Sequence, residues 1–278
     1  MTSQELLQWY IDAGVDETIS DHPVNRFRQE AGRSEGSTGK QQASVPSPTN
    51  EAPHPGFADA SPAPSPPPPP AAKLSPTNGD LTAAVHLAKA AKTVEELQRA
   101  LKSFDACGLK KTATNLVFSD GNEKAPVLFV GEGPGAEEDR QGLPFVGPSG
   151  KLLDKMLASI GLDRTGVLIS NTVFWRPPGN RTPTPQETAI CLPFVERLIE
   201  LVDPKILVTL GGPAAKSLLA QTAGVGRLRG KWFEYETAGM TSPIDATALY
   251  HPAYLLRSPG QKRDTWRDLL AIKHKLAG

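Results

Sequence analysis

The chain has 278 residues, and its 30 Lys and Arg balance its 30 Asp and Glu, so the formal net charge is zero. Its two cysteines form no closely spaced pair, which excludes a disulfide framework and favours a reducing compartment. No apolar run approaches the ~20 residues of a membrane helix, and the N-terminus lacks the basic and apolar regions of a signal peptide. We therefore expect a soluble, cytoplasmic protein with no part in a membrane.

Residues 1–29 are expected to form a short N-terminal helical segment. Ser3 can cap a helix over 3–18, in which apolar side chains fall on one stripe: Leu6, Leu7, Tyr10 and Ile11. An isolated helix of this length is marginal in water. It either docks on a partner, a protein partner for this arm included, or stays a marginal helix without one.

Residues 30–79 are predicted to be a disordered linker rich in Pro, Ser and Ala. Twelve prolines lie between Pro46 and Pro76. Such a segment cannot bury enough apolar surface to fold, and its proline runs favour extended polyproline II. A plain spacer is favoured over a ligand for an aromatic groove. Residues 1–80 carry a net charge of −5 and the remainder +5, which is compatible with a polyanionic partner for the basic part.

Residues 80–278 are predicted to form one α/β domain in which strands and helices alternate. This order implies a parallel sheet with helices on both faces. The expected helices are 80–101, 149–160, 186–202, 213–222 and 264–276, and the expected strands are one beginning at Val127 and those at 167–171, 205–210, 231–235 and 246–250.

The stretch 127–136, VLFVGEGPGA, is the most informative part of this domain. A buried strand ends in three glycines around Pro134, with Glu132 inside the turn. Glycine permits positive φ and the close approach of a ligand, and open α/β sheets bind ligands at the carboxyl ends of their strands. A binding site is therefore favoured over a structural turn.

The glycines match a loose dinucleotide-binding pattern, but phosphate is a poor ligand for this turn. Pro134 removes an amide, and the acidic run 137–139 stands where a helix N-terminus would meet the phosphates. No Lys-Ser or Lys-Thr follows the glycines, so the turn is not a P-loop either.

Two further polar residues end predicted strands of the same sheet. Asn171 closes one strand, and its amide presents a donor and an acceptor side by side. His251 follows the last strand and precedes Pro252. Alone, Asn171 is more often a structural turn former and His251 is as often structural as functional, but together with Glu132 they indicate one polar site.

Four motifs resemble those of the uracil-DNA glycosylase superfamily, most of all its family 4. They are 131–135 (GEGPG), 142–147 (GLPFVG), Asn171 with 176–181 (RPPGNR), and 251–257 (HPAYLLR). The resemblance runs from about residue 105 to the C-terminus. It implies a three-layer α/β/α sandwich with a short central parallel sheet, here preceded by the disordered Pro-rich arm.

The resemblance also implies roles for individual residues. Phe145 stacks on a uracil flipped out of DNA, Asn171 binds its O4 and N3–H, and His251 donates to O2. Glu132 orients water or offsets charge on the sugar, so Glu132 and His251 are the expected catalytic residues. Gly133, Pro134, Gly135 and Glu138 complete the pocket, with Glu138 helping to exclude thymine.

DNA contacts are expected on three segments. Leu255, Leu256 and Arg257 resemble the loop that wedges into the duplex. Three arginines are expected to contact the phosphate backbone of DNA: Arg181, Arg227 and Arg229.

Family 4 proteins carry a 4Fe-4S cluster on four cysteines, and here the chain departs from the family. Cys107 and Cys191 fit two of the positions, whereas Lys110 and Trp175 stand at the others. Two thiolates cannot replace four. We therefore expect no cluster, no metal and no other cofactor, with the two cysteines as remnants of a cluster site.

The expected function is a monofunctional uracil-DNA glycosylase of base excision repair, a monomer that acts on DNA containing uracil at the bacterial nucleoid. The alternative is a protein that binds uracil or abasic sites in DNA with little turnover. A related branch traps such sites through a histidine after the Asn motif, and residues 176–185 contain none, which favours turnover.

Overall fold

The computed structural model describes residues 77–278, which belong to one compact unit. The helical segment expected at 1–29 lies outside the described residues, as does the linker expected at 30–79 apart from its last residues, 77–79. Within residues 77–278, no helix has the length and apolar character needed to span a lipid bilayer.

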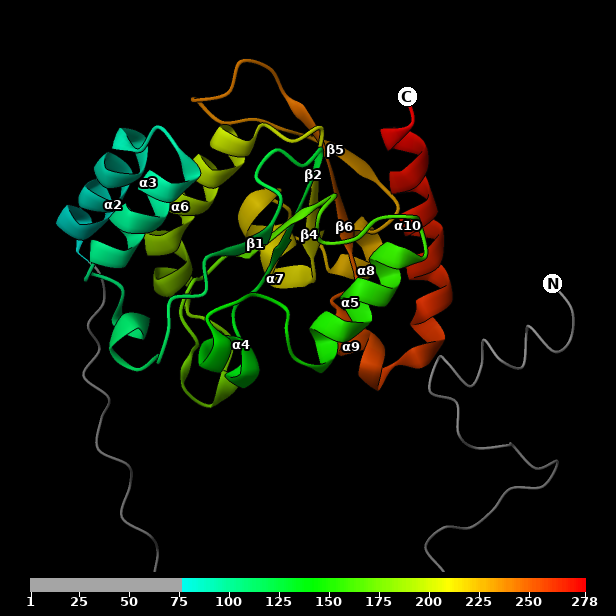
Figure 1. Cartoon of the computed structure of the whole chain (residues 1–278), viewed down its shortest axis with the longest axis horizontal. Helices are drawn as coiled ribbons and strands as arrows, with labels where there is room; N and C mark the ends of the chain where they lie inside the picture. The colour runs from blue at the N-terminus through cyan, green and yellow to red at the C-terminus, as the bar shows by residue number, and fades with distance from the viewer. Residues whose placement is uncertain (1–76) are drawn as a thin grey trace, which may run out of the picture. The chain divides into compact units, whose positions relative to one another are not determined.

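A sheet of six strands, in the order β1-β3-β2-β4-β6-β5, forms the centre of the unit (Figure 1). The four inner strands run parallel, and the two edge strands, β1 and β5, pair antiparallel with their neighbours. The strands are β1 (Ser119–Gly121), β2 (Val127–Gly131), β3 (Leu168–Asn171), β4 (Ile206–Leu210), β5 (Trp232–Tyr235) and β6 (Ile244–Leu249).

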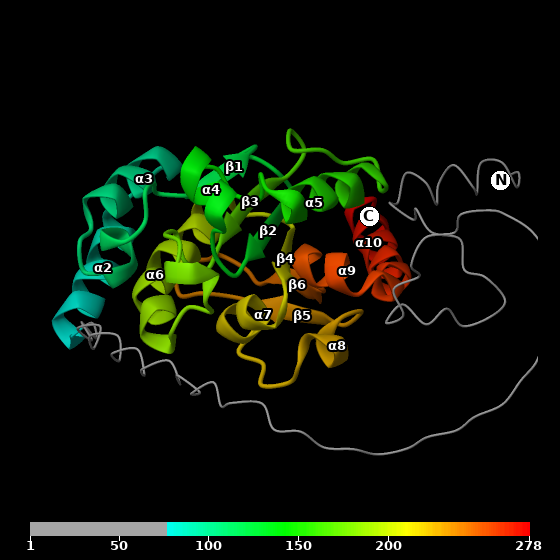
Figure 2. The same cartoon turned by 90° about the horizontal axis from the view of Figure 1, so that it is seen from below.

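Helices cover both faces of this sheet, because successive strand residues point to opposite sides. Leu128 and Val130 pack in one apolar cluster, and Val127 and Phe129 in another. The first cluster is covered by α2 (Asn78–Ala90), α3 (Val94–Ser103), α6 (Pro185–Val202), α7 (Gly212–Leu218) and α8 (Val225–Leu228). The second is covered by α5 (Pro148–Ala158), α9 (Pro252–Arg257) and α10 (Lys262–Leu276). Figures 1 and 2 show these helices on either side of the sheet, so the predicted three-layer sandwich is confirmed.

The remaining elements are short: α4 (Ala136–Gln141) follows the glycine turn, and the single turns η1 (Gly108–Lys111), η2 (Pro178–Asn180) and η3 (Pro259–Gln261) lie in connections.

Several details differ from the sequence prediction. The helix expected over 80–101 is two helices, because Ala91 is extended and Thr93 caps a new helix by accepting a hydrogen bond from the N–H of Glu96. The first helix is capped by Thr77 in a capping box with Asp80. The segment after β6, expected to form a loop at residues 255–257, is helix α9.

The carboxyl ends of the parallel strands bring the predicted polar residues to one edge. Gly131 at the end of β2 pairs with Asn171 at the end of β3, and β6 ends two residues before His251. Glu132 directly follows β2. Residues far apart in sequence thus share one edge because their strands lie in parallel register.

Candidate active site

A cavity of about 430 Å³ opens at this edge of the sheet. Most of the predicted site residues line it: Glu132, Gly133, Pro134, Gly135, Glu138, Phe145, Asn171, Arg181, His251 and Arg257. The cavity is thus formed by the glycine turn, the end of β3, the loop before α6 and the start of α9.

Phe145 supplies the aromatic wall. Its ring centroid lies 5.5 Å from that of His251, with 31° between the ring planes. A Cβ added at Gly131 would lie 2.6 Å from Phe145 Cζ and 2.6 Å from Asn171 Oδ1. Only glycine therefore lets the aromatic ring and the amide both approach the end of β2.

Asn171 is a deeply buried polar group of the cavity, with 1% of its surface exposed. Among the described residues, its Oδ1 is a buried oxygen without a hydrogen-bond partner. An unpaired buried oxygen costs about 1–3 kcal/mol, so such atoms call for an explanation. A ligand that donates a hydrogen bond here would provide the missing partner.

His251 caps α9, because its Nδ1 accepts a hydrogen bond from the N–H of Ala253 at 3.1 Å. Burial, together with the smaller effect of the charge of Arg257, lowers the pKa of His251 to about 4, and Glu138 has a still smaller opposite effect. The imidazole is therefore neutral at pH 7. Since Nδ1 is the acceptor, Nε2 carries the proton and is the available donor.

Glu132 lies half-buried at the cavity wall. Burial raises the pKa of its carboxyl group, and a hydrogen bond from the Thr182 side chain acts in the opposite direction. Its backbone carbonyl accepts from the hydroxyl of Thr172 at 2.7 Å. The carboxylate is thus held at the junction of the glycine turn and the loop before α6.

Glu138 holds two loops of the cavity together. One carboxylate oxygen accepts from the N–H of Gly135 at 3.1 Å, and the other accepts from the N–H groups of Val146 at 3.0 Å and Gly147 at 2.9 Å. These bonds tie the glycine turn to the segment that carries Phe145.

The predicted wedge residues differ in exposure. Leu255 is 1% exposed and packs in the apolar cluster beside α10, whereas Leu256 is 45% exposed. The helical rotation of α9 turns Leu255 inward, so it cannot enter a duplex without leaving the core. Of this pair only Leu256 is free to act as a wedge.

The arginines expected to contact the DNA backbone also differ in exposure. Arg227 is exposed, and Arg257 is exposed at the cavity. Arg229 is instead largely buried and binds both carboxylate oxygens of Asp268, at 2.8 and 2.9 Å. Its guanidinium joins α10 to the segment after α8, so Arg229 makes a contact inside the protein.

Arg181 is exposed and lines the cavity, but it also binds the carboxylate of Glu187, at 2.6 and 2.8 Å. Glu187 closes the capping box of α6 with Thr184. This pair therefore anchors the loop before α6.

Sequence reasoning missed several lining residues, although it identified the loops that carry some of them. They are Ser149, Pro177, Asn180, Thr182, Pro183, Ala253 and Tyr254. The proline-rich stretch 176–185 was the available signal, because its stiffness fixes the side chains between its prolines.

The two cysteines lie together, with sulfur atoms 3.9 Å apart and both side chains buried. Trp175 is buried in the same apolar cluster. Among residues 77–278, no group of three or more His, Cys, Asp or Glu side chains is arranged to hold a metal ion. Two thiols beside a tryptophan do not fit a 4Fe-4S cluster, which needs four ligands.

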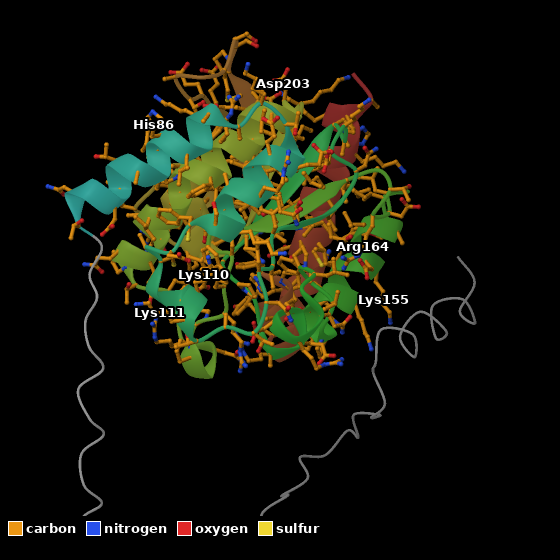
Figure 3. The ribbon with its side chains drawn as sticks, turned by 60° about the vertical axis from the view of Figure 1, so that its left-hand side comes forward. His86, Lys110, Lys111, Lys155, Arg164 and Asp203 are labelled. Atoms are coloured by element: carbon orange, nitrogen blue, oxygen red, sulfur yellow. The ribbon has the colours of Figure 1, made fainter. Side chains whose placement is uncertain are left out.

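Lys110, at the remaining cluster position, makes an internal contact of its own (Figure 3). Its ammonium donates to the carbonyl oxygens of Lys102 at 2.6 Å and Phe104 at 3.1 Å, and to the carboxylate of Asp105 at 2.6 Å. It thereby joins η1 to the end of α3 without a metal.

The cavity has the size and polarity to receive one planar base, with an aromatic wall, a buried amide and a neutral imidazole donor. Such a pocket at the edge of an open α/β sheet defines a protein that binds a nucleobase taken out of its stack. The sequence model of the Uracil DNA glycosylase superfamily matches residues 118–270, and the chain belongs to this superfamily.

Relatives of known name agree with this assignment. The Type-4 uracil-DNA glycosylase of Archaeoglobus fulgidus is 41% identical over 184 residues, which cover 65% of this chain and 92% of the relative. That of Pyrobaculum aerophilum is 37% identical over 180 residues, 63% of this chain and 91% of the relative. That of Thermotoga maritima is 39% identical over 166 residues, 59% of this chain and 84% of the relative.

Proposed function

We propose that this chain is a monofunctional uracil-DNA glycosylase of base excision repair, which flips uracil out of DNA, hydrolyses its N-glycosidic bond and leaves an abasic site. The observation that carries the proposal is the buried, unpaired Oδ1 of Asn171 in a cavity shared with a neutral His251. The names of the relatives support the same activity.

Asn171 selects the base. Its Oδ1 accepts from uracil N3–H while its amide nitrogen donates to O4, with the ring stacked on Phe145. Cytosine presents the opposite pattern at these positions and would leave buried polar groups unpaired, so it is rejected. Gly133, Pro134 and Gly135 form the wall opposite, and Glu138 holds that wall in place against the larger thymine.

His251 and Glu132 carry the chemistry. Water adds to C1′ of the sugar, and the electron pair of the broken bond leaves with N1 of uracil. The Nε2–H of His251 donates to O2 as negative charge develops there, an effect worth about 3–4 kcal/mol per donor in other enzymes. Glu132 orients the water and offsets positive charge on the sugar, and the proton released by the water ends on the uracil that departs.

DNA containing uracil is the proposed partner. Three exposed arginines contact the phosphates: Arg181, Arg227 and Arg257. The exposed Leu256 fills the gap that the flipped base leaves in the duplex. Binding should weaken with salt. We further propose that the protein is a monomer that acts in the cytoplasm at the nucleoid, and that any protein partner binds the N-terminal arm.

We also propose that the chain works without a 4Fe-4S cluster or another cofactor. Two thiols in place of four support this proposal. Iron analysis of anaerobically purified protein tests it: less than one iron per chain is expected, and about four irons with an absorption band near ~400 nm would contradict it.

Release of free base from oligonucleotides containing uracil, hypoxanthine, xanthine or a thymine mismatch tests the activity, in single and double strands. Uracil is expected as the main product. If the wild type releases no uracil from either substrate, the proposal is wrong. Denaturing gels of the same reactions separate turnover from the alternative, because a protein that traps its site would remain linked to DNA.

A further inference from the structure

The backbone of Phe145 has φ = +54°. This left-handed conformation is uncommon for a residue with a side chain and is unfavourable unless surrounding contacts impose it. Phe145 is also the proposed stacking partner of the base, so the contacts that impose this conformation also determine where the ring stands.

Arg164, labelled in Figure 3, lies on the connection between α5 and β3 and makes these contacts. Its guanidinium donates to the carbonyl oxygen of Phe145, and to that of Pro144 at 3.1 Å. The same group binds the carboxylate of Asp120 at 2.5 Å and that of Asp154 at 2.8 Å. The planar guanidinium of Arg164 therefore joins the turn at Phe145 to β1 and to α5.

The start of α5 closes the other side of the turn. A Cβ added at Gly150 would lie 1.7 Å from the carbonyl oxygen of Phe145. The carbonyl is thus confined between the helix and the guanidinium. Because the carbonyl points to Arg164, the ring on the same residue is directed toward His251 and Asn171.

We propose that Arg164 is a positioning residue for base stacking: it holds the carbonyls of Pro144 and Phe145 so that the Phe145 ring stands ready for the extruded base. The inference rests on the proposed function, since uracil is the base that Phe145 stacks on. Asp120 on β1 and Asp154 on α5 orient the guanidinium of Arg164. Lysine cannot replace it fully, because an ammonium lacks the planar set of five donors.

The test compares Arg164→Gln and Arg164→Lys with a matched control, Arg197→Gln. Arg197 is equally part-buried and also binds a backbone carbonyl and a carboxylate, those of Ala91 and Glu200, none of which lines the cavity. Each variant is assayed for kcat and KM on single-stranded uracil DNA and for inhibition by free uracil. Thermal unfolding and circular dichroism report folding.

We expect Arg164→Gln to lower kcat and weaken inhibition by free uracil about tenfold while KM for DNA changes little, since a misplacement of ~1 Å at a reacting centre has effects of this order or larger. Arg164→Lys should restore part of the loss. Arg197→Gln should lower stability without changing the inhibition constant.

A double-mutant cycle with Phe145→Ala separates positioning from general stability. If Arg164 acts through the ring, Arg164→Gln has no further effect on uracil inhibition once the ring is gone. An equal effect in both backgrounds overturns the proposal, as does an Arg164→Gln enzyme within about twofold of the wild type. Should Arg164→Gln fail to fold, the cycle with Arg164→Lys decides. A wild type without uracil release marks failure of the proposed function itself.

Discussion

The Nδ1 atom of His251 accepts the backbone N–H of Ala253 at 3.1 Å. This bond caps helix α9 and fixes the tautomer of the imidazole at the same time. This one contact thus links the start of helix α9 to the nitrogen from which His251 can donate a hydrogen bond.

Removing the imidazole tests the role of that donor. His251→Ala should slow single-turnover uracil release about 10²–10³-fold, as the loss of one oxyanion donor does elsewhere. His274, exposed on α10, provides the control, and His274→Ala should retain wild-type rates. Equal rates for His251→Ala and the wild type would exclude His251 from the reaction.

The pH dependence of the rate follows from two pKa shifts of opposite sign. His251, with a pKa of about 4, stays neutral through the ordinary histidine range, so its own titration should cause no change in rate near pH 6.5. The pKa of Glu132 is raised by burial, and the carboxylate is lost as pH falls through that value. The pH–rate profile should therefore fall on the acid side, and Glu132→Gln should lack this acid limb at a lower overall rate.

Stability should also depend on pH through His251. Its pKa is about 4 when folded and 6.5 when unfolded, so between these values the unfolded chain binds more protons and stability falls as pH falls. Urea unfolding at about pH 4.5 and pH 7 should show a loss of about 2 kcal/mol in the wild type relative to His251→Asn. A difference between the two proteins that does not vary with pH would show that the histidine titrates normally.

The two leucines of α9 should separate folding from DNA contact. Leu255→Ala should lower the free energy of unfolding by about 3 kcal/mol, because it leaves a cavity in the core. Leu256→Ala should leave stability within about 0.5 kcal/mol and reduce uracil release from duplex more than from single strands. Denaturant titration and paired assays on the two substrates measure both effects, and the reverse pattern would assign the wedge to Leu255.

The four positions at which the family carries its 4Fe-4S cysteines offer a gain-of-function test. Lys110→Cys with Trp175→Cys restores four cysteines in the family pattern, and the double variant should take up iron during anaerobic reconstitution while the wild type does not. Iron content and absorption near ~400 nm report the outcome. The control is the double variant with Cys191→Ser in addition, which should lose the band. Equal iron in all three proteins would mean that the positions were assigned wrongly.

The pocket was predictable because its residues end parallel strands or follow them. Glu132, Asn171 and His251 are brought together because parallel strands end at one edge of the sheet, and the parallel direction follows from the alternation of strands and helices. The family motifs added Phe145, which no periodicity indicates, since it lies in a loop between glycines.

Other features depended on partners that the sequence does not pair. The helical phase that buries Leu255 and exposes Leu256 is set by packing in the apolar cluster shared with α5, and Arg229 binds Asp268 across 39 residues of chain. Arg164 likewise meets Asp120 across 44 residues, and the break between α2 and α3 depends on a cap at Thr93.

The sequence by itself determined the class of fold, the edge of the sheet where the site lies and the chemical groups present there, because strand order and residue type suffice for these. The tertiary structure alone decided which charged groups are free and which are bound within the protein, which leucine faces solvent, and what holds Phe145 in its left-handed conformation. These depend on side-chain contacts between distant segments, whose geometry exists only once the layers have packed.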